Sequence, residues 1–143
     1  MRILGLDIGS KRIGVAVSDE LGFTAQAVET LSCKNPEEDA AAILRLTEKY
    51  NAEEIVVGIP YNMDGTEGPQ VEKVRNTIET IKKQVNVPIR EWDERLSTVA
   101  AERVLLEADM SRSKRRKVID KLAAALILQG YLDRKSVKER SNS

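Results

Sequence analysis

Four acidic residues stand in strand-end or apolar surroundings, where a lone carboxylate is costly. Asp7 interrupts the apolar run at residues 3–8, Asp93 and Glu94 follow a short strand-like run, and Asp120 lies on the apolar face of a helical stretch. Because burying an unpaired charge is strongly unfavourable, such acids cap an element, pair with a cation or bind a metal. Carboxylate oxygens are the ligands that Mg²⁺ and Mn²⁺ prefer. The acids are therefore candidate ligands for a hard divalent metal.

Simpler roles remain open for two of these acids. Asp7 could cap the turn before Gly9, and Asp120 could merely complement a helix dipole. Three converging carboxylates would repel one another by up to about 4 kcal/mol per close pair at an effective dielectric of about 20. Two Mg²⁺ ions about 3.5–4 Å apart would remove that repulsion and could activate a water for phosphodiester hydrolysis. The hypothetical catalytic and metal-binding residues are Asp7, Glu94 and Asp120, with Asp93 as an additional candidate ligand.

The composition excludes several other chemistries. The 143 residues include no His and a single Cys, Cys33. A Ser-His-Asp or Cys-His catalytic site is therefore impossible, and zinc would lack its usual ligands. A lone Cys excludes an internal disulfide and favours a reducing compartment, so we expect a cytoplasmic protein. No apolar run is long enough to span a bilayer, and we expect no membrane partner.

The basic residues indicate an anionic partner. Lys plus Arg equals Asp plus Glu at 23 each, but clustering matters more than net charge for nucleic-acid binding. Cations at a helix start oppose the dipole at a cost of about 0.3–1 kcal/mol each, so nucleic-acid phosphate is a natural counter-charge; a solvated charged turn is the alternative. The candidate substrate-binding residues are Lys11 and Arg12 in the first hairpin turn, Arg95 at a strand end, and Arg112, Lys114, Arg115, Arg116 and Lys117 at the start of the last helix.

The hydrophobic pattern predicts the elements that would position these residues. Alternating or continuous apolar runs predict strands, and a 3.6-residue spacing predicts helices. The fold class is therefore α/β, with a five-stranded mixed sheet of three antiparallel and then two parallel strands. We expect one domain over residues 1–134 and a flexible polar tail over 135–143. The predicted strands are 3–8, 13–17, 23–31, 54–59 and 88–92, and the predicted helices are 36–50, 71–85, 97–107 and 113–132.

Local signals refine this picture. Asn35 and Pro36 form a helix start, with Asn35 as the N-cap. The Gly- and Pro-rich loop 60–69 follows a buried strand, which is where α/β proteins bind ligands. Trp92 and Tyr131 are predicted to pack in the core, whereas Tyr61 on that loop could also contact a base.

Four segments together resemble the YqgF (RuvX) family: 6–9 (LDIG), 58–69 (GIPYNMDGTEGP), 93–98 (DERLST) and 119–124 (IDKLAA). The resemblance implies a ribonuclease H-like fold with helices on both faces of the sheet, related to Holliday-junction resolvases of the RuvC type. It also implies a nuclease that matures the 5′ end of pre-16S rRNA, so structured RNA or branched DNA is the expected partner. The family's acidic positions fall on Asp7, on the Asp93–Glu94 pair with Glu94 preferred, and on Asp120.

One feature departs from the wider superfamily. The strand that ends at residues 58–60 carries no acid where many relatives place one. The second ligand must therefore come from the next strand.

Two rival functions remain. Residues 7–10 also resemble the phosphate-binding hairpin of actin-like ATPases and sugar kinases, but those proteins clamp ATP between two such domains. Gly9 and Gly14 have P-loop spacing, yet Val15 stands where that motif requires Lys. A non-catalytic nucleic-acid-binding or transcription-associated module would keep the same fold and basic surface.

Overall fold

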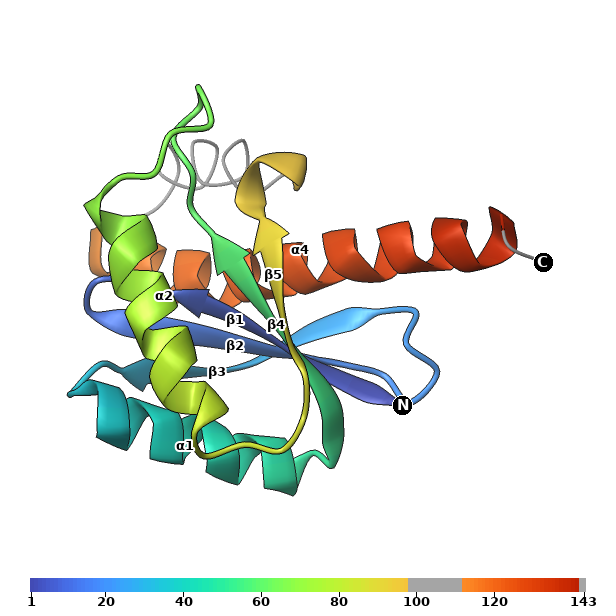
Figure 1. Cartoon of the computed structure of the whole chain (residues 1–143), viewed down its shortest axis with the longest axis horizontal. Helices are drawn as coiled ribbons and strands as arrows, with labels where there is room; N and C mark the ends of the chain where they lie inside the picture. Colours follow the sequence, from blue (N-terminus) through green and yellow to red (C-terminus); the bar gives the residue numbers. More distant parts are fainter. Residues whose placement is uncertain (98–111, 142–143) are drawn as a thin grey trace.

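A mixed sheet and the helices around it make up the described part of the chain (Figure 1). The computed structural model describes residues 1–97 and 112–141, without the side chains of 112–121, 137 and 139–141. The elements are β1 (Arg2–Ile8), β2 (Arg12–Ser18), β3 (Ala25–Ser32), α1 (Pro36–Lys49), β4 (Ala52–Ile59), α2 (Pro69–Lys82), β5 (Ile89–Asp93), the 3₁₀ turn η1 (Glu94–Leu96) and α4 (Arg112–Ser141).

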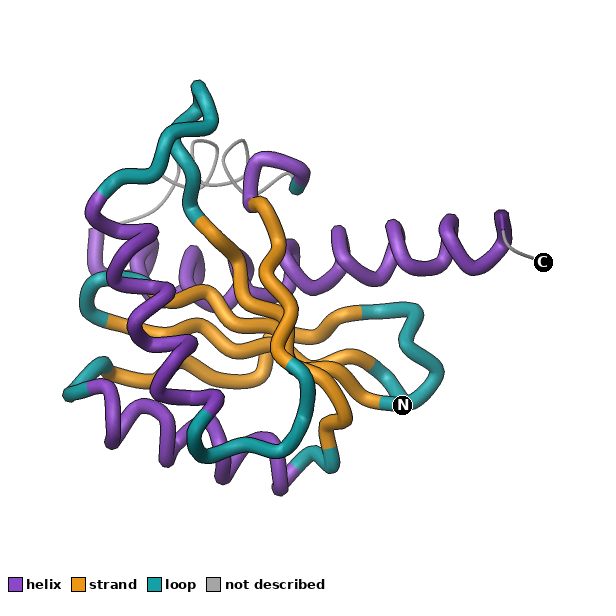
Figure 2. The backbone as a smooth tube through the Cα atoms, viewed as in Figure 1, coloured by secondary structure: helices purple, strands orange, loops and turns teal. Residues whose placement is uncertain are grey.

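The five strands lie side by side in one sheet (Figure 2), in the order β3-β2-β1-β4-β5. β1, β2 and β3 pair antiparallel through tight turns, whereas β4 pairs parallel with both β1 and β5. Parallel neighbours need a crossover, which α1 and α2 supply. The predicted mixed sheet is confirmed. The carboxyl ends of β1, β4 and β5 lie together at one end of the strands; this end is called here the site edge, and the other end of the strands the opposite edge.

The two faces of the sheet are covered by different helices. α1 and α2 pack on one face, and α4 crosses the other (Figure 1). Side chains alternate along a strand, so Leu4, Leu6 and Ile8 of β1 join the core beneath α1 and α2, and Ile3 joins the core beneath α4. Asp7 shares the α4 face by the same alternation.

The first helix begins as its sequence predicts. The Asn35 side chain accepts a 2.8 Å hydrogen bond from the Glu38 amide, and Pro36 occupies the first helical position. This bond satisfies one of the amide groups that a helix start leaves without an intrahelical partner.

The end of the chain differs from its prediction. α4 continues to Ser141, so residues 135–141 are helical where a flexible tail was expected. Neither Pro nor Gly follows Gly130 to stop the helix, and the Lys135 ammonium lies 3.5 Å from the Glu54 carboxylate on the sheet. The predicted helix 97–107 falls, beyond Ser97, outside the described residues, and the single-domain boundary at 134 stays a prediction. Within the described residues, no helix is both long and apolar enough to cross a membrane.

Candidate active site at the ends of the parallel strands

Asp7 lies at the end of the central strand β1. Its side chain is only 6% exposed. Position 7 is two residues beyond Gly5, which faces α4: a Cβ on Gly5 would lie 2.7 Å from the Leu128 Cβ. Asp7 therefore points to the same side of the sheet as α4, at the site edge.

Two side chains of α2 donate hydrogen bonds to the turn that follows Asp7. The Gln70 side-chain amide donates to the Ile8 carbonyl at 3.1 Å, and the Lys73 ammonium donates to the carbonyls of Gly9 and Ser10 at 3.2 and 2.7 Å. These bonds fix the backbone immediately after Asp7. The sequence analysis missed Gln70 and Lys73, because no local pattern links a helical residue to a turn more than 60 positions earlier.

Glu94 reaches the same place from β5. It follows the strand as the first residue of η1 and is 9% exposed. Its side chain lies across β4 at Gly58, since a Cβ on Gly58 would be 2.9 Å from Glu94 Oε1. Leu6 pairs with Val57, so Asp7 stands beside Gly58 on the neighbouring strand, at about the usual 4.8 Å strand spacing. Gly58 thus leaves room for the Glu94 carboxylate over the strand that neighbours Asp7.

Gly58 is a residue of the candidate site whose close contacts the sequence analysis did not predict. A Gly inside a strand marks a close approach of other atoms, and here two approach it. Besides Glu94, the Ile127 Cδ1 of α4 would lie 2.5 Å from a Cβ at this position. Gly5 and Gly58 together allow α4 to rest directly on the sheet.

The direction of α4 places Asp120 near the site edge. Gln129 accepts a 2.9 Å bond from the Ala25 amide at the opposite edge, whereas the Ala124 carbonyl would lie 3.1 Å from a Cβ on Gly5. From Ala124, four residues toward the helix start cover about 6 Å, close to the roughly 6.6 Å between Gly5 and Asp7 on the strand. The α4 backbone at Asp120 is thus level with Asp7.

The Asp120 side chain lies outside the described residues. Within the described part of the chain, no group of three or more His, Cys, Asp or Glu side chains is placed to hold a metal. The described contribution to the predicted metal site therefore consists of Asp7 and Glu94.

Asp93 is turned to a different partner. Its carboxylate accepts bonds from the Arg95 guanidinium at 2.7 and 3.1 Å and from the Arg95 amide at 2.9 Å. The hydrogen bonds from the Arg95 side chain lower the pKa of Asp93. The two adjacent acids are thus separated, with Glu94 under α4 and Asp93 paired beside the loop 60–69.

Comparison with known proteins identifies the family of the chain. A family description, "RuvX: Holliday junction resolvase", matches residues 1–134. A protein of Halothermothrix orenii named "Putative pre-16S rRNA nuclease" is 59% identical over 133 residues, which cover 93% of this chain and 95% of that protein. A protein of Clostridium acetobutylicum with the same name is 59% identical over 93% of this chain and 98% of its own length. The chain belongs to the RuvX family.

Solved structures support the fold of this RuvX protein. T. thermophilus RuvC in complex with Holliday junction substrate superposes with a TM-score of 0.61 at 16% identity, covering 94% of this chain and 96% of that chain. The fowlpox virus Holliday junction resolvase superposes with a TM-score of 0.54 at 18% identity, over 93% and 99% of the two chains. At such identities the likeness shows the fold alone, and the predicted ribonuclease H-like fold is confirmed.

The basic residues of the RuvX chain gather near the same edge. Lys11 is exposed and Arg12 half-buried in the β1–β2 turn, and Arg95 is paired with Asp93. Because α4 runs away from the site edge, its first turns begin there (Figure 1). The backbones of Arg112, Lys114, Arg115, Arg116 and Lys117 lie in those turns, and their side chains fall outside the description.

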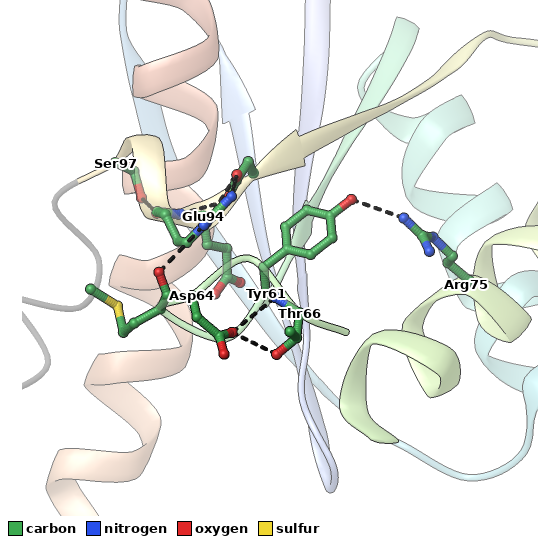
Figure 3. Close-up of polar contacts among 9 residues, drawn as sticks. Tyr61, Asp64, Thr66, Arg75, Glu94 and Ser97 are labelled. Carbon is green, nitrogen blue, oxygen red and sulfur yellow. Dashed lines mark hydrogen bonds and ion pairs between the residues drawn. The ribbon is translucent and has the colours of Figure 1, made fainter. Parts of the chain in front are cut away.

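The aromatic residues have separate roles. Trp92 of β5 and Tyr131 of α4 pack edge to face, with ring centroids 6.0 Å apart. Both belong to the core between α4 and the sheet, and the predicted core positions are confirmed. Tyr61 lies between two guanidinium groups, those of Arg75 and Arg95, at 5.9 and 5.5 Å from its ring centroid. Its hydroxyl accepts a 2.9 Å bond from Arg75 (Figure 3). Tyr61 therefore supports the loop 60–69 from within.

A further buried acid, Glu54, lies far from the site edge at the start of β4. It is 6% exposed and accepts a hydrogen bond from the Tyr131 hydroxyl. Arg90 and Lys135 lie 3.7 and 3.5 Å from its carboxylate. Burial, with this hydrogen bond, raises the pKa of Tyr131 to about 12. The sequence analysis missed Glu54 because an acid before an apolar run reads as an exposed strand start.

Proposed function

We propose that this RuvX protein is a metal-dependent nuclease that hydrolyses phosphodiester bonds in structured RNA, with the 5′ end of pre-16S rRNA as its substrate. The observation that carries the proposal is the buried Glu94 carboxylate, which lies over Gly58 on the strand next to Asp7. The RNA substrate follows the names of the relatives. The resolvase relatives make branched DNA the second substrate to test.

The donor set fits a hard cation. Asp7 and Glu94 supply carboxylate oxygens at one sheet edge, and the chain has no His for a softer metal. We expect Asp7, Glu94 and Asp120 to hold two Mg²⁺ or Mn²⁺ ions. When bound, such ions supply an activated water and stabilise the charge on the leaving oxygen.

The chain's own residues prepare this site. Gly58 leaves the space that Glu94 occupies, and Lys73 holds the turn after Asp7 in one backbone conformation. A catalytic group held by its surroundings loses little freedom when substrate binds, which favours reaction. Asp93 neutralises Arg95, so we place it as a support of the site rather than a metal ligand.

The basic residues are proposed to hold the substrate backbone. Lys11 and Arg12 lie in the turn directly after the Asp7 strand, and the five basic residues of α4 begin the helix that carries Asp120. If they contact phosphates, log Kd should rise linearly with log salt. Neutralising two of the α4 residues, as in R115Q/R116Q, should reduce that slope by about 2, and an unchanged slope would contradict their role.

The direct experiment measures cleavage of a structured RNA and of a four-way DNA junction side by side, with Mg²⁺, with Mn²⁺ and with EDTA. We expect D7N, E94Q and D120N each to lose at least about 100-fold in cleavage rate, because even outer-shell partners of a metal contribute 10–100-fold. E54Q is the matched control, since Glu54 is an equally buried acid at the other sheet edge. Full activity of D7N, or equal loss in E54Q, would contradict the proposal.

Two rival functions make different predictions. A non-catalytic nucleic-acid-binding module would bind both substrates and cleave neither with any metal. An ATP-binding domain would bind ATP in calorimetry, and D7N would abolish that binding. The lone Cys33 and an rRNA substrate both fit a cytoplasmic location, which fractionation would test.

A further inference from the structure

Two large apolar side chains are exposed beside the site edge. Met63, in the loop 60–69, is 84% exposed, and Leu96, at the end of η1, is 57% exposed. A larger exposed apolar patch with a polar rim marks an interaction site, whereas single exposed apolar side chains are normal. The other large apolar side chains that the described residues expose are Met1, Leu21, Phe23 and Leu122.

Arg95 contacts the loop that carries Met63 and directly precedes Leu96 in the chain. Its guanidinium lies 3.5 Å from the Met63 carbonyl oxygen, and Leu96 is the next residue in the chain. The same guanidinium is paired with Asp93 and stacks over Tyr61. Arg95 thus links the loop that carries Met63 to η1, which ends at Leu96; Met63 and Leu96 are called here the tip pair.

The loop that carries Met63 is internally bonded (Figure 3). The Asn62 amide donates to the Thr66 carbonyl at 3.0 Å, and the Gly65 amide donates to the Asn62 carbonyl at 2.8 Å. The Asp64 carboxylate accepts bonds from the amide and hydroxyl of Thr66 at 3.0 and 2.6 Å. Met63 is therefore presented outward on a formed turn, and less ordering is needed when it binds a partner.

The charges around the tip pair disfavour a phosphate. Arg95 is neutralised by Asp93, and Arg75 by Glu67 and by Glu91 at 3.4 Å. Asp64 adds a carboxylate at the tip itself, and its pKa is lowered by the bonds from Thr66. A backbone phosphate would meet this negative charge, whereas the apolar face of a base would not.

We infer that the tip pair contacts an unstacked base of the substrate and directs cleavage to unpaired or branched positions. This inference rests on the proposed nuclease function. Met and Leu are among the side chains that proteins insert between bases, and a mismatched or unpaired base costs least to unstack. Because the loop and η1 follow β4 and β5, this base would lie beside the end of the strands that carries Asp7 and Glu94, where the scissile phosphate is expected.

The test measures binding in EDTA, so that cleavage does not interfere. The probes are an RNA stem with an unpaired 5′ extension that carries 2-aminopurine at the boundary, and a fully paired RNA duplex of the same length. We expect M63A/L96A to weaken binding to the first probe about tenfold, which corresponds to about 1.4 kcal/mol, and to lose the 2-aminopurine signal. Binding to the duplex should stay within about twofold, because phosphate contacts dominate there.

Two controls separate this role from general damage. L21A removes an equally exposed apolar side chain at the opposite edge of the sheet and should bind both probes normally. M63L keeps an apolar tip and should retain the discrimination. Equal loss on both probes, or no loss on either, would overturn the inference; unchanged RNA binding together with loss of a protein partner would overturn it in favour of a protein-binding tip.

The inference and the proposed function fail in different ways. Wild-type protein that cleaves with Mg²⁺ while M63A/L96A discriminates normally would refute the tip pair alone. Wild-type protein that cleaves no probe with any metal would refute the nuclease.

Discussion

The two faces of one sheet are built from the same strands but have opposite characters. Alternate residues of β1 give Leu4, Leu6 and Ile8 to the face under α1 and α2, and Gly5 and Asp7 to the face under α4. β4 divides in the same way, with large apolar side chains on the α1–α2 face and Glu54, Val56 and Gly58 on the α4 face. The α1–α2 face is apolar along both strands, whereas the α4 face combines an apolar core with acids and with glycines that let a helix pack closely.

The sharpest test of this contrast compares two neighbours in β1. L6A should lower the free energy of unfolding by about 2–5 kcal/mol, because it leaves a cavity in a fully buried core. D7N should change the free energy of unfolding far less in EDTA, because an amide replaces a carboxylate of almost the same volume and opens no cavity, while cleavage is lost. Urea unfolding of both variants in EDTA checks this, and a similar fall in both would remove the distinction between the faces.

The next largest effect concerns the close contact of α4. G5A should cost about 1–3 kcal/mol, because its Cβ would lie 2.7 Å from the Leu128 Cβ and 3.1 Å from the Ala124 carbonyl. Displacement of α4 should also reduce cleavage. G68A is the matched control: its Cβ would meet no atom closer than 3.6 Å, and we expect a cost below about 1 kcal/mol from poorer N-capping. Equal costs would argue against tight packing on this face.

A smaller effect is expected at the other acid of the α4 face. E54Q should lower the free energy of unfolding by about 1–2 kcal/mol. The neutral amide weakens the hydrogen bond from the Tyr131 hydroxyl and removes the ion pairs with Arg90 and Lys135. Cleavage at saturating Mg²⁺ should stay near the wild-type rate. Thermal unfolding and cleavage measured on one preparation would show whether this acid serves the fold alone.

Tyr131 adds a pH signature to that cluster. Its pKa is raised to about 12 from the usual 10.0, so its contribution to stability is complete below about pH 10 and is lost as the pH rises toward 12. The stability difference between wild type and Y131F should therefore shrink between about pH 9 and pH 11.5. Denaturant titrations at both pH values measure it, and a constant difference would contradict the buried Tyr131–Glu54 bond.

The smallest effect is expected at Asp93. D93N weakens a half-exposed pair with Arg95, which is worth about 0–1 kcal/mol, and cleavage should change only a few-fold. Loss of activity as large as in E94Q would instead identify Asp93 as a ligand. The comparison of D93N with E94Q thus decides between two adjacent acids that the sequence pattern does not separate.

Much of the fold could be predicted because its signals are local. Alternation in 3–8 and 13–17 gave the hairpin, and Asn35 with Pro36 gave the start of α1. The start of β3 and the end of α4 were less well predicted. β3 begins at Ala25, whose amide donates to the Gln129 side chain of α4, and Lys135 in the continued part of α4 lies 3.5 Å from Glu54; both contacts join residues far apart in sequence.

By itself, the sequence determined the family of this protein and its candidate site residues. The four family segments indicate the RuvX family, and the acids in apolar surroundings are the proposed metal ligands, because residue types and short-range spacing are enough for such conclusions. Only the tertiary structure decided which of the acids lie at the same end of the strands. Parallel pairing places Asp7 beside Gly58, and the missing side chain of Gly58 leaves room for Glu94. Asp93 forms an ion pair with Arg95 instead. Those relations depend on strand register and on distances across the fold, which no local pattern encodes.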